Sequence, residues 1–411
     1  MYYLFIKMKK ILLYGSLCAT IALAASCGKD KGVSPVVPVV PPPVTPPVTA
    51  VSYLKLAGET HDYVLGNLIT QYSSYRANTT SNSNAAFEWY QVSQVYADAA
   101  MVAAGDASYL PYMNKTFKWM DNMWDKSTAT GGYFAACNLD GSGAGGDKYV
   151  DDNGLTGIVF LEAYDITTGT DKQAYFDKAK ACGDWIINSG LWDNTYGGGF
   201  WWSTAKPFKP TQANGVALQL FLRLYNITGQ ATYKEWALKT NAWLSGSMYD
   251  ATKKLYIWKI DGAGSGTKHT EIFTYDNAVM VEADLLYNTI LNDATYLTKA
   301  QTLGNAMNAT LWNPAGKMYI FNTDPSQTRV NPAWCGWGSQ GMIRLYEADK
   351  NAMWLTYAQG NIDGLNKACR DTTTHGYSFF ARMDGTDRAP EREGVDQAWM
   401  QRVQALLSKY K

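Results

Sequence analysis

Two consecutive acids, Asp151 and Asp152, are the residues of this chain best placed to do chemistry. They follow a glycine-rich loop and precede an apolar stretch, beginning at Gly154, that predicts a helix. Ionisation of one acid raises the pKa of its neighbour, so the pair can divide into a carboxylate and a proton donor. Cleavage of a glycosidic bond requires such a pair. The same residue types are also favoured as helix caps, so the motif alone leaves a purely structural role open.

Other candidate residues lie near the starts of further predicted helices. Trp201 and Trp202 follow three glycines, and neighbours in an extended loop point opposite ways. We therefore expect one of them to contact substrate, as a stacking surface under a sugar ring or a cleft wall, and the other to pack inward. Tyr275 and Asp276 begin a later helix, where helix capping is the rival role for Asp276. The weaker substrate-binding candidates are Asn214, Trp334, Trp337 and Gln397.

A repeated helical hairpin is the element that must position these residues. An apolar helix ends near a tyrosine, a tight polar turn follows, and a second, amphipathic helix begins. The turn tyrosines recur about 60 residues apart, which indicates one repeated supersecondary unit; they are Tyr164, Tyr225, Tyr287 and Tyr346. The first helix of each pair is apolar around its circumference, which is typical of an inner helix.

Twelve helices are expected, six inner and six outer, and such pairs close into an all-α (α/α)6 barrel. Long links rich in glycine and aromatic residues lead into the inner helices, whereas the turns at the other end are short. The long links therefore gather on one rim, which should hold the site. The expected helices span residues 58–75, 88–104, 107–125, 154–167, 172–189, 212–227, 231–246, 275–291, 294–311, 336–348, 351–369 and 391–409.

Composition excludes some classes of protein and favours others. The 36 basic and 36 acidic residues balance, which argues against a nucleic-acid partner. Aromatic residues make up 14% of the chain, more than a core needs, and their flat faces suit sugar rings. No cysteine or histidine spacing indicates a metal site, so no metal or cofactor is expected. Two disulfides or four buried thiols are open to Cys137, Cys182, Cys335 and Cys369, and buried thiols are favoured.

The first fifty residues are predicted to be an export signal followed by a spacer between the membrane anchor and the domain. Lysines precede an apolar stretch, and Ala24-Ala25-Ser26-Cys27 resembles a bacterial lipobox. Residues 1–27 are thus expected to be a lipoprotein signal peptide with Cys27 as the lipid anchor. Residues 28–52 form a proline-rich spacer, and 53–411 the helical domain. The protein is expected in the cell envelope, on the membrane through Cys27, as a monomer.

Four segments in order resemble glycoside hydrolase family 76. They are YVDDNGLTGIVFLEAYDITTG (149–169), YGGGFWW (196–202), ANGVALQLFLRLYNITG (213–229) and FTYDNAVMVEADLLY (273–287). The resemblance runs from about residue 56 to the C-terminus. The chain departs from the family at Asp276-Asn277-Ala278, where members often have Asn-Gln-Gly, and in the segment from Asn331 to Lys350.

The resemblance implies an endo-acting, retaining α-1,6-mannanase that needs no cofactor. By position in the motif, Asp151 corresponds to the nucleophile and Asp152 to the general acid/base, and the substrate is α-mannan. Two alternatives stay open. One is an (α/α)6 enzyme acting on uronic-acid oligosaccharides, such as an unsaturated glucuronyl hydrolase, and the other is a non-catalytic glycan-binding lipoprotein.

Overall fold

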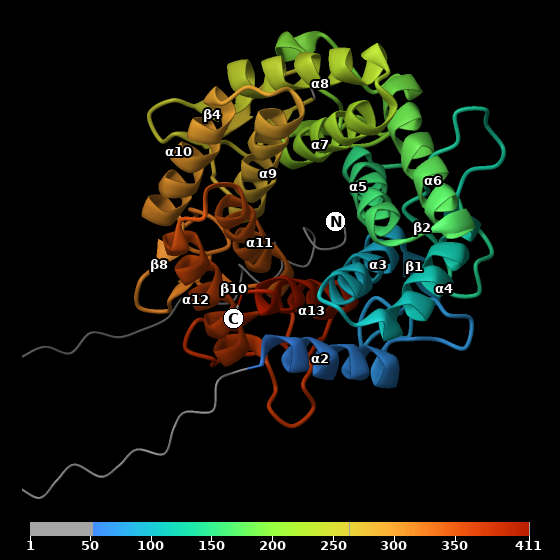
Figure 1. The fold of residues 1–411 in the computed structure, drawn as a ribbon, viewed down its shortest axis with the longest axis vertical. Coiled ribbons are helices and arrows are strands. Elements are labelled where there is room, and N and C mark those ends of the chain that lie inside the picture. The colour runs from blue at the N-terminus through green and yellow to red at the C-terminus, as the bar shows by residue number, and fades with distance from the viewer. Residues whose placement is uncertain (1–51, 263, 411) are drawn as a thin grey trace, which may run out of the picture. The chain divides into compact units, whose positions relative to one another are not determined.

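The computed structural model describes residues 52–262 and 264–410 of the chain. The predicted signal peptide, the anchor Cys27 and nearly all of the proline-rich spacer lie outside these residues. Residues Val51–Lys411 form one compact unit. Its described part contains twelve α-helices in two concentric rings (Figure 1), which is the (α/α)6 barrel expected from the repeat.

Six helices form the inner ring, and each has a largely buried surface. Neighbours in this ring pack on one another in chain order, and the last packs on the first. The ring is therefore closed. Its members are α3 (Glu88–Ala103), α5 (Val150–Ile166), α7 (Thr211–Thr228), α9 (Thr274–Ile290), α11 (Pro332–Asp349) and α13 (Gly394–Ser408).

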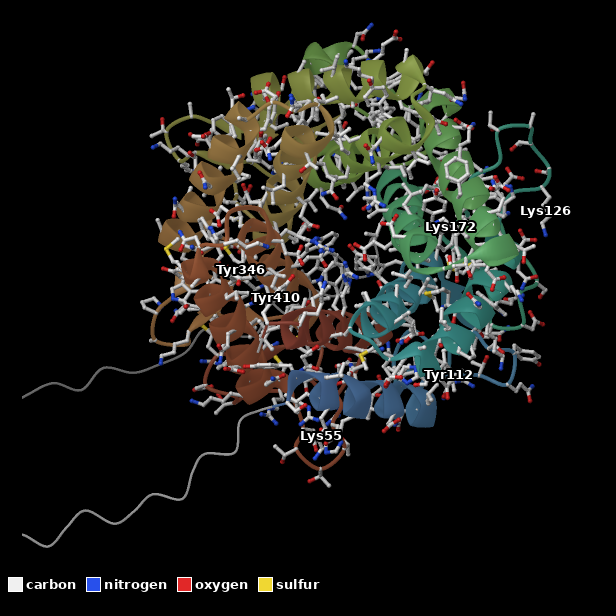
Figure 2. The ribbon with its side chains drawn as sticks, in the orientation of Figure 1. Lys55, Tyr112, Lys126, Lys172, Tyr346 and Tyr410 are labelled. Carbon is white, nitrogen blue, oxygen red and sulfur yellow. The ribbon has the colours of Figure 1, made fainter. Side chains whose placement is uncertain are left out.

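The outer ring covers the inner one with amphipathic helices. Lys55 and Lys126 lie on the outside of this ring (Figure 2), with side chains that are 75% and 64% exposed. Hydrophobic burial of one face holds each outer helix in place. The members are α2 (Tyr53–Asn67), α4 (Leu110–Met120), α6 (Gly169–Asn188), α8 (Ala231–Trp243), α10 (Thr295–Thr310) and α12 (Ala352–Cys369).

Each of the first five inner helices is followed by a tight turn onto an outer helix, and α13 is the last helix of the described residues. After α7, Gly229 adopts a left-handed conformation with φ of 67°, and its N–H bonds the carbonyl of Tyr225. After α11, Lys350 takes the same conformation. Because each turn reverses the chain onto an outer helix, every inner helix begins on the same rim. Six positive helix-dipole ends therefore converge there, a field that favours acidic side chains.

Short strands fasten the long links on that rim. Three small sheets join links from different repeats, so the links support one another: β1 (Ala85–Phe87) with β2 (Ala136–Asn138), β3 (Phe208–Pro210) with β6 (Lys259–Asp261) and β7 (Lys268–His269), and β10 (Arg329–Val330) with β11 (Ala381–Arg382). Two hairpins lie within single links: β4 (Tyr249–Asp250) with β5 (Leu255–Tyr256), and β8 (Trp312–Asn313) with β9 (Met318–Tyr319).

Helix boundaries depart from the expected ones mainly at N-termini. The helix expected over 58–75 spans Tyr53–Asn67, because the Ser52 hydroxyl caps its start and a turn closed by the Ile69–Tyr75 bridge follows its end. Helix α11 begins at Pro332 instead of 336, since proline fits the first helical turn. Helix α5 begins at Val150 instead of 154, which places both acids inside its first turn.

All four cysteines of the described region are buried and free: Cys137, Cys182, Cys335 and Cys369. Buried thiols were the favoured alternative. No helix in the part of the chain that the structure covers is both long and apolar enough to cross a bilayer.

Candidate active site

Asp151 and Asp152 lie in the first turn of α5, on the rim where the long links gather. Asp151 is buried, with 3% of its surface exposed, whereas Asp152 is partly exposed. The indole N–H of Trp202 donates a hydrogen bond of 2.9 Å to Oδ2 of Asp151, and Oδ1 has no partner. One carboxyl is therefore fixed in orientation, and the other has access to solvent.

The electrostatics of the pair separate the two acids. Burial raises the pKa of Asp151 to about 6, and the Trp202 hydrogen bond opposes that rise. Burial, together with the negative charge of Asp151, raises the pKa of Asp152 to about 8. Because Asp151 has the lower pKa of the two, it ionises first, which leaves Asp152 as the proton donor of the pair. A nucleophile and an acid side by side suit double-displacement cleavage of a glycoside.

The triple glycine explains how Trp202 reaches Asp151. Gly197, Gly198 and Gly199 all have positive φ, and a Cβ on Gly199 would lie 2.6 Å from the ring of Trp243. Only glycine fits this close turn. After it, the chain extends along the link into α5, and the N–H of Val150 bonds the carbonyl of Trp202.

Neither tryptophan of this loop has the free face that a sugar platform needs. Trp202 is 1% exposed, because its ring lies between Phe208 and Tyr149. Trp201 points the other way and is 8% exposed, with the ammonium group of Lys209 over its ring at 4.6 Å. Both indoles are buried, so the expected division into one substrate-contacting and one inward-packing tryptophan is not present. The expected stacking role is replaced, for Trp202, by positioning of Asp151.

The side-chain amides of Asn214 and Gln397 do not face a substrate, because they hydrogen-bond the backbone of the links and fix it in place. Asn214 is fully buried, accepts from the N–H of Phe200, and donates to the carbonyls of Phe200 and Pro210. Gln397 repeats this pattern on Tyr377 and Glu393. Substrate binding is therefore the wrong role for both, since every polar atom of these amides is used by backbone.

The same amide clamp recurs around the rim. In α3, α5 and α9 a first-turn amide pairs with the backbone of a link aromatic: Gln91 with Tyr75, Asn153 with Tyr133, and Asn277 with Tyr256. In α11 the corresponding first-turn residue is Cys335, which has no side-chain amide. Asn361 of α12 makes the clamp instead: its side chain accepts a hydrogen bond from the N–H of Tyr319 and donates one to the carbonyl of Cys335. The six clamps fix the links that surround the acids.

An aromatic cluster fills the rim beside the acids. Tyr275, Trp334 and Trp337 are buried, with 2–4% of their surface exposed. Trp89, in the first turn of α3, is partly exposed and stacks on Trp334 and Trp337 at 5.6 and 6.2 Å between ring centroids. The three predicted residues thus form a layer beneath Trp89, which is the side chain of this cluster that reaches solvent.

Asp276 is fully buried, and neither of its carboxyl oxygens makes a hydrogen bond of normal geometry. Burial raises its pKa well above the usual range and so favours the neutral, protonated form. A neutral carboxyl has the shape of an asparagine side chain. It can therefore take the place of the Asn that the resemblance leads us to expect here, and it is buried away from the surface.

Glu88 and Trp89 are the two rim residues that sequence reasoning missed. Glu88 is the first residue of α3, is fully buried, and accepts a hydrogen bond from the hydroxyl of Thr156 in α5. The signal was available, because these residues begin the first inner helix just as Asp151 and Asp152 begin the second.

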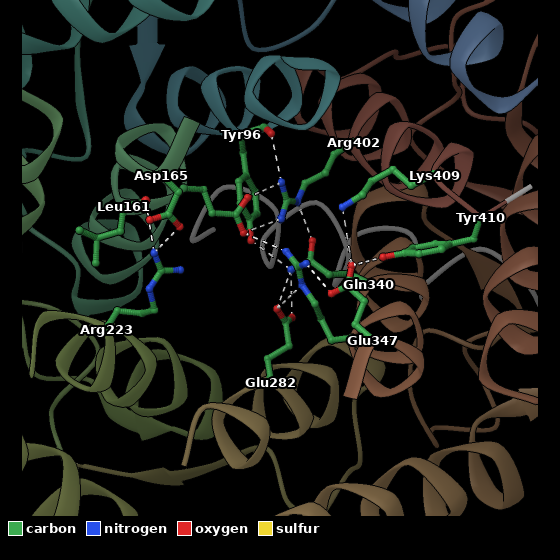
Figure 3. A network of polar contacts seen from close by, with 12 residues as sticks. Tyr96, Leu161, Asp165, Arg223, Glu282, Gln340, Glu347, Arg402, Lys409 and Tyr410 are labelled. Atoms are coloured by element: carbon green, nitrogen blue, oxygen red, sulfur yellow. Dashed lines mark hydrogen bonds and ion pairs between the residues drawn. The ribbon is translucent and has the colours of Figure 1, made fainter. Parts of the chain in front are cut away.

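A network of charged side chains links the inner helices, further along α5 than the acids (Figure 3). Arg344 of α11 contacts Glu162 of α5 at 3.1 Å, although these two helices are opposite each other in the ring. Buried Arg402 of α13 joins them through Glu162 at 3.0 Å and through Gln340 at 2.6 Å. A cavity of about 430 Å³ lies on this side, lined by Glu162, Arg223, Glu282 and Arg344 among others. None of the predicted site residues lines it.

Over residues 52–262 and 264–410, no group of three or more histidine, cysteine or acidic side chains is arranged to hold a metal ion.

The helical barrel, the paired carboxyls and the aromatic rim are features expected of a carbohydrate-active enzyme of the glycoside hydrolase class. The sequence pattern of glycosyl hydrolase family 76 matches residues 59–332, two thirds of the chain. The chain belongs to this family. A search of the curated proteins found no match.

Solved structures share the fold at low sequence identity. An α-mannanase of this family from Bacteroides thetaiotaomicron has a TM-score of 0.78 and 20% identity, over 88% of this chain and 97% of that one. An inactive variant of an α-1,6-mannanase from Salegentibacter sp., with two consecutive aspartates replaced and α-1,6-mannotriose bound, has a TM-score of 0.70 and 18% identity, over 87% and 98%. A cellobiose 2-epimerase from Bacillus thermoamylovorans has a TM-score of 0.70 and 12% identity, over 85% and 98%.

Proposed function

We propose that this protein is a retaining endo-α-1,6-mannanase that cleaves internal bonds of an α-mannan backbone. One observation carries the proposal: two adjacent acids in one helix turn have pKa values raised to different extents, with the more acidic one held by Trp202. The α-1,6-mannanase from Salegentibacter, inactive when two consecutive aspartates are replaced, supports the choice of bond.

The proposed reaction has two steps. In the first, an oxygen of Asp151 bonds the anomeric carbon while Asp152 gives its proton to the departing glycosidic oxygen. A glycosyl ester on Asp151 and a carboxylate at Asp152 result. In the second step Asp152 takes a proton from water, the water oxygen bonds the anomeric carbon, and Asp151 is released. Two displacements at one carbon retain its configuration.

The test is release of reducing sugar from debranched yeast α-mannan by wild type, Asp151→Asn and Asp152→Asn. Removal of either carboxyl is expected to lower kcat by at least about a thousandfold, since each takes part in bond making. Trp201→Phe is the matched control and should keep activity. Early products followed by NMR should have the α configuration, and β products would contradict the retaining assignment.

Other outcomes identify the alternatives. Mannan binding without release by the wild type would favour a glycan-binding protein. Turnover of unsaturated uronides, with none of mannan, would favour a uronide-processing enzyme. Conversion of cellobiose to an epimer would favour the chemistry of the structurally similar epimerase.

We also propose that the hydrolase is a monomer tethered to the cell envelope through a lipid on Cys27. The lipobox-like Ala24-Ala25-Ser26-Cys27 and the proline-rich spacer after it support this proposal. In the producing bacterium, Cys27→Ala should move the protein from the membrane fraction to the soluble fraction. Retention of the variant in membranes would contradict lipid anchoring.

A further inference from the structure

Glu88 brings a third carboxyl group to the acid pair. Its Oε1 accepts the hydroxyl of Thr156, which follows Asp152 by one helical turn and so lies on the same face of α5. Helices α3 and α5 pack side by side, and both begin on the same rim (Figure 1). Glu88 is therefore held against the side of α5 that carries Asp152.

The second oxygen of Glu88 is buried and makes no hydrogen bond. The side chain has no exposed surface, so this atom is not placed to contact a polysaccharide at the rim. Buried polar atoms are normally paired, because an unpaired one is costly. An atom left unpaired in the resting enzyme is suited to a partner that arises during the reaction.

The charges on the three carboxyl groups, before and after the glycosyl ester forms, indicate which group that partner is. Burial raises the pKa of Glu88 well above its usual range, and the negative charges of Asp152 and Asp151 raise it further. With Glu88 protonated, the cluster would hold a single negative charge before reaction, on Asp151. When the ester forms, that charge moves to Asp152. A protonated Glu88 adds no second charge to oppose this transfer.

We propose, building on the function proposed above, that Glu88 is a positioning residue of the site. It stays protonated, and its O–H stabilises the carboxylate that forms on Asp152 when the glycosyl ester is made. Glu88 acts through Asp152 and does not touch the sugar. No proton leaves Glu88 during the cycle.

Two substitutions of similar volume separate this role from a packing role. Glu88→Gln keeps a neutral polar group with N–H donors, whereas Glu88→Met removes the donor. The readouts are the alkaline limb of the pH profile of kcat/KM on α-1,6-mannooligosaccharide, and the burst of first product that appears when breakdown of the ester limits turnover.

Glu88→Gln is expected to keep the alkaline limb within about half a pH unit of wild type. Glu88→Met should move it upward by about one pH unit, because a hydrogen bond to a charged group of ordinary strength is lost. Glu88→Met should also produce a burst, since the base required for the second step is then less readily formed.

Two results would overturn the proposal. A fall of the alkaline limb by a unit or more in Glu88→Gln would mean that Glu88 is ionised in the wild type. Unchanged limbs and no burst in both variants would leave Glu88 with a packing role only. Glu88→Met leaves the hydroxyl of Thr156 without its partner. If that variant does not fold, the double variant Glu88→Met/Thr156→Val removes this hydroxyl as well and can be measured in its place. Absence of wild-type activity on the mannooligosaccharide would instead refute the proposed function.

Discussion

The indole of Trp202 and the carboxyl of Asp151 form a 2.9 Å hydrogen bond that ties the link before α7 to the first turn of α5. This bond stabilises the carboxylate form. Trp202→Phe should therefore raise the pKa of Asp151 by about one unit, because hydrogen bonds to charged groups contribute about 1.5–3 kcal/mol. The acid limb of the pH profile should move to higher pH. Trp201→Phe should leave that limb unchanged, and an equal shift in both variants would refute the assignment.

A bell-shaped pH profile is expected for the wild type. The proposed mechanism requires ionised Asp151, with a pKa of about 6, and protonated Asp152, with a pKa of about 8. Below the first value the nucleophile is protonated, and above the second the acid has lost its proton. Measurement of kcat/KM between about pH 4 and pH 10 should show a maximum between the two limbs. Full activity well below the acid limb would contradict the proposed roles.

Trp89 is expected to bind substrate. Its partly exposed indole rests on buried Trp334 and Trp337, which preorganise it as a platform for a sugar ring. Trp89→Ala should raise KM for α-1,6-mannooligosaccharides by about threefold to tenfold, which is the loss of affinity expected when one aromatic contact is removed. Trp89→Phe should raise KM less. Tyr72→Ala removes a 48% exposed aromatic from the α2 link and is the control. Equal KM values for the Trp89 and Tyr72 variants would rule out the platform.

Asp276→Asn should make stability less dependent on pH. The pKa of Asp276 is raised by folding, so its favourable contribution is complete below the unfolded value near 3.9 and is lost as pH rises toward the folded value. Above about pH 4, the variant should gain up to about 1.4 kcal/mol over wild type per pH unit. Urea unfolding at several pH values measures this difference. A constant difference would mean that Asp276 is ionised in the native state.

The network of charged side chains should contribute strongly to stability. Arg402→Met removes the buried guanidinium that pairs with Glu162. The free energy of unfolding should therefore fall by about 3–5 kcal/mol, because one partner of a buried ion pair is lost. Arg223→Met is the control, because its partner Asp165 is half exposed and the loss should be about 1 kcal/mol or less. Similar losses in both variants would show that the network has no special role.

Helical periodicity predicted the barrel because the ring in which each helix packs follows from which of its faces are apolar. The apolar inner helices and one-sided outer helices must pack as two rings, and the described residues contain the twelve α-helices that were expected. Helix starts were less predictable. In α5 the residues before Gly154 are polar and look like a turn, yet Asn153 binds the backbone of Tyr133 and holds them in the helix.

Roles of individual rim residues could not be derived from position alone. Asn214, Gln397 and Asp151 all lie in first turns, but only the paths of the links show which side chain turns toward them. The clamp at α11 illustrates the limit. Its amide, Asn361, comes from an outer helix, and nothing in the spacing of the sequence assigns it to Tyr319.

The ion pair between Glu162 and Arg344 has a consequence for the passage of polymer. Because it joins helices on opposite sides of the ring, it crosses the barrel axis, so the polysaccharide of the proposed reaction could not thread through the molecule. A long chain would lie across the open rim, with both of its ends outside, and any fragment would depart by the side from which the chain arrived. The length of the fragments would then be decided by the links around the rim and not by the depth of the barrel.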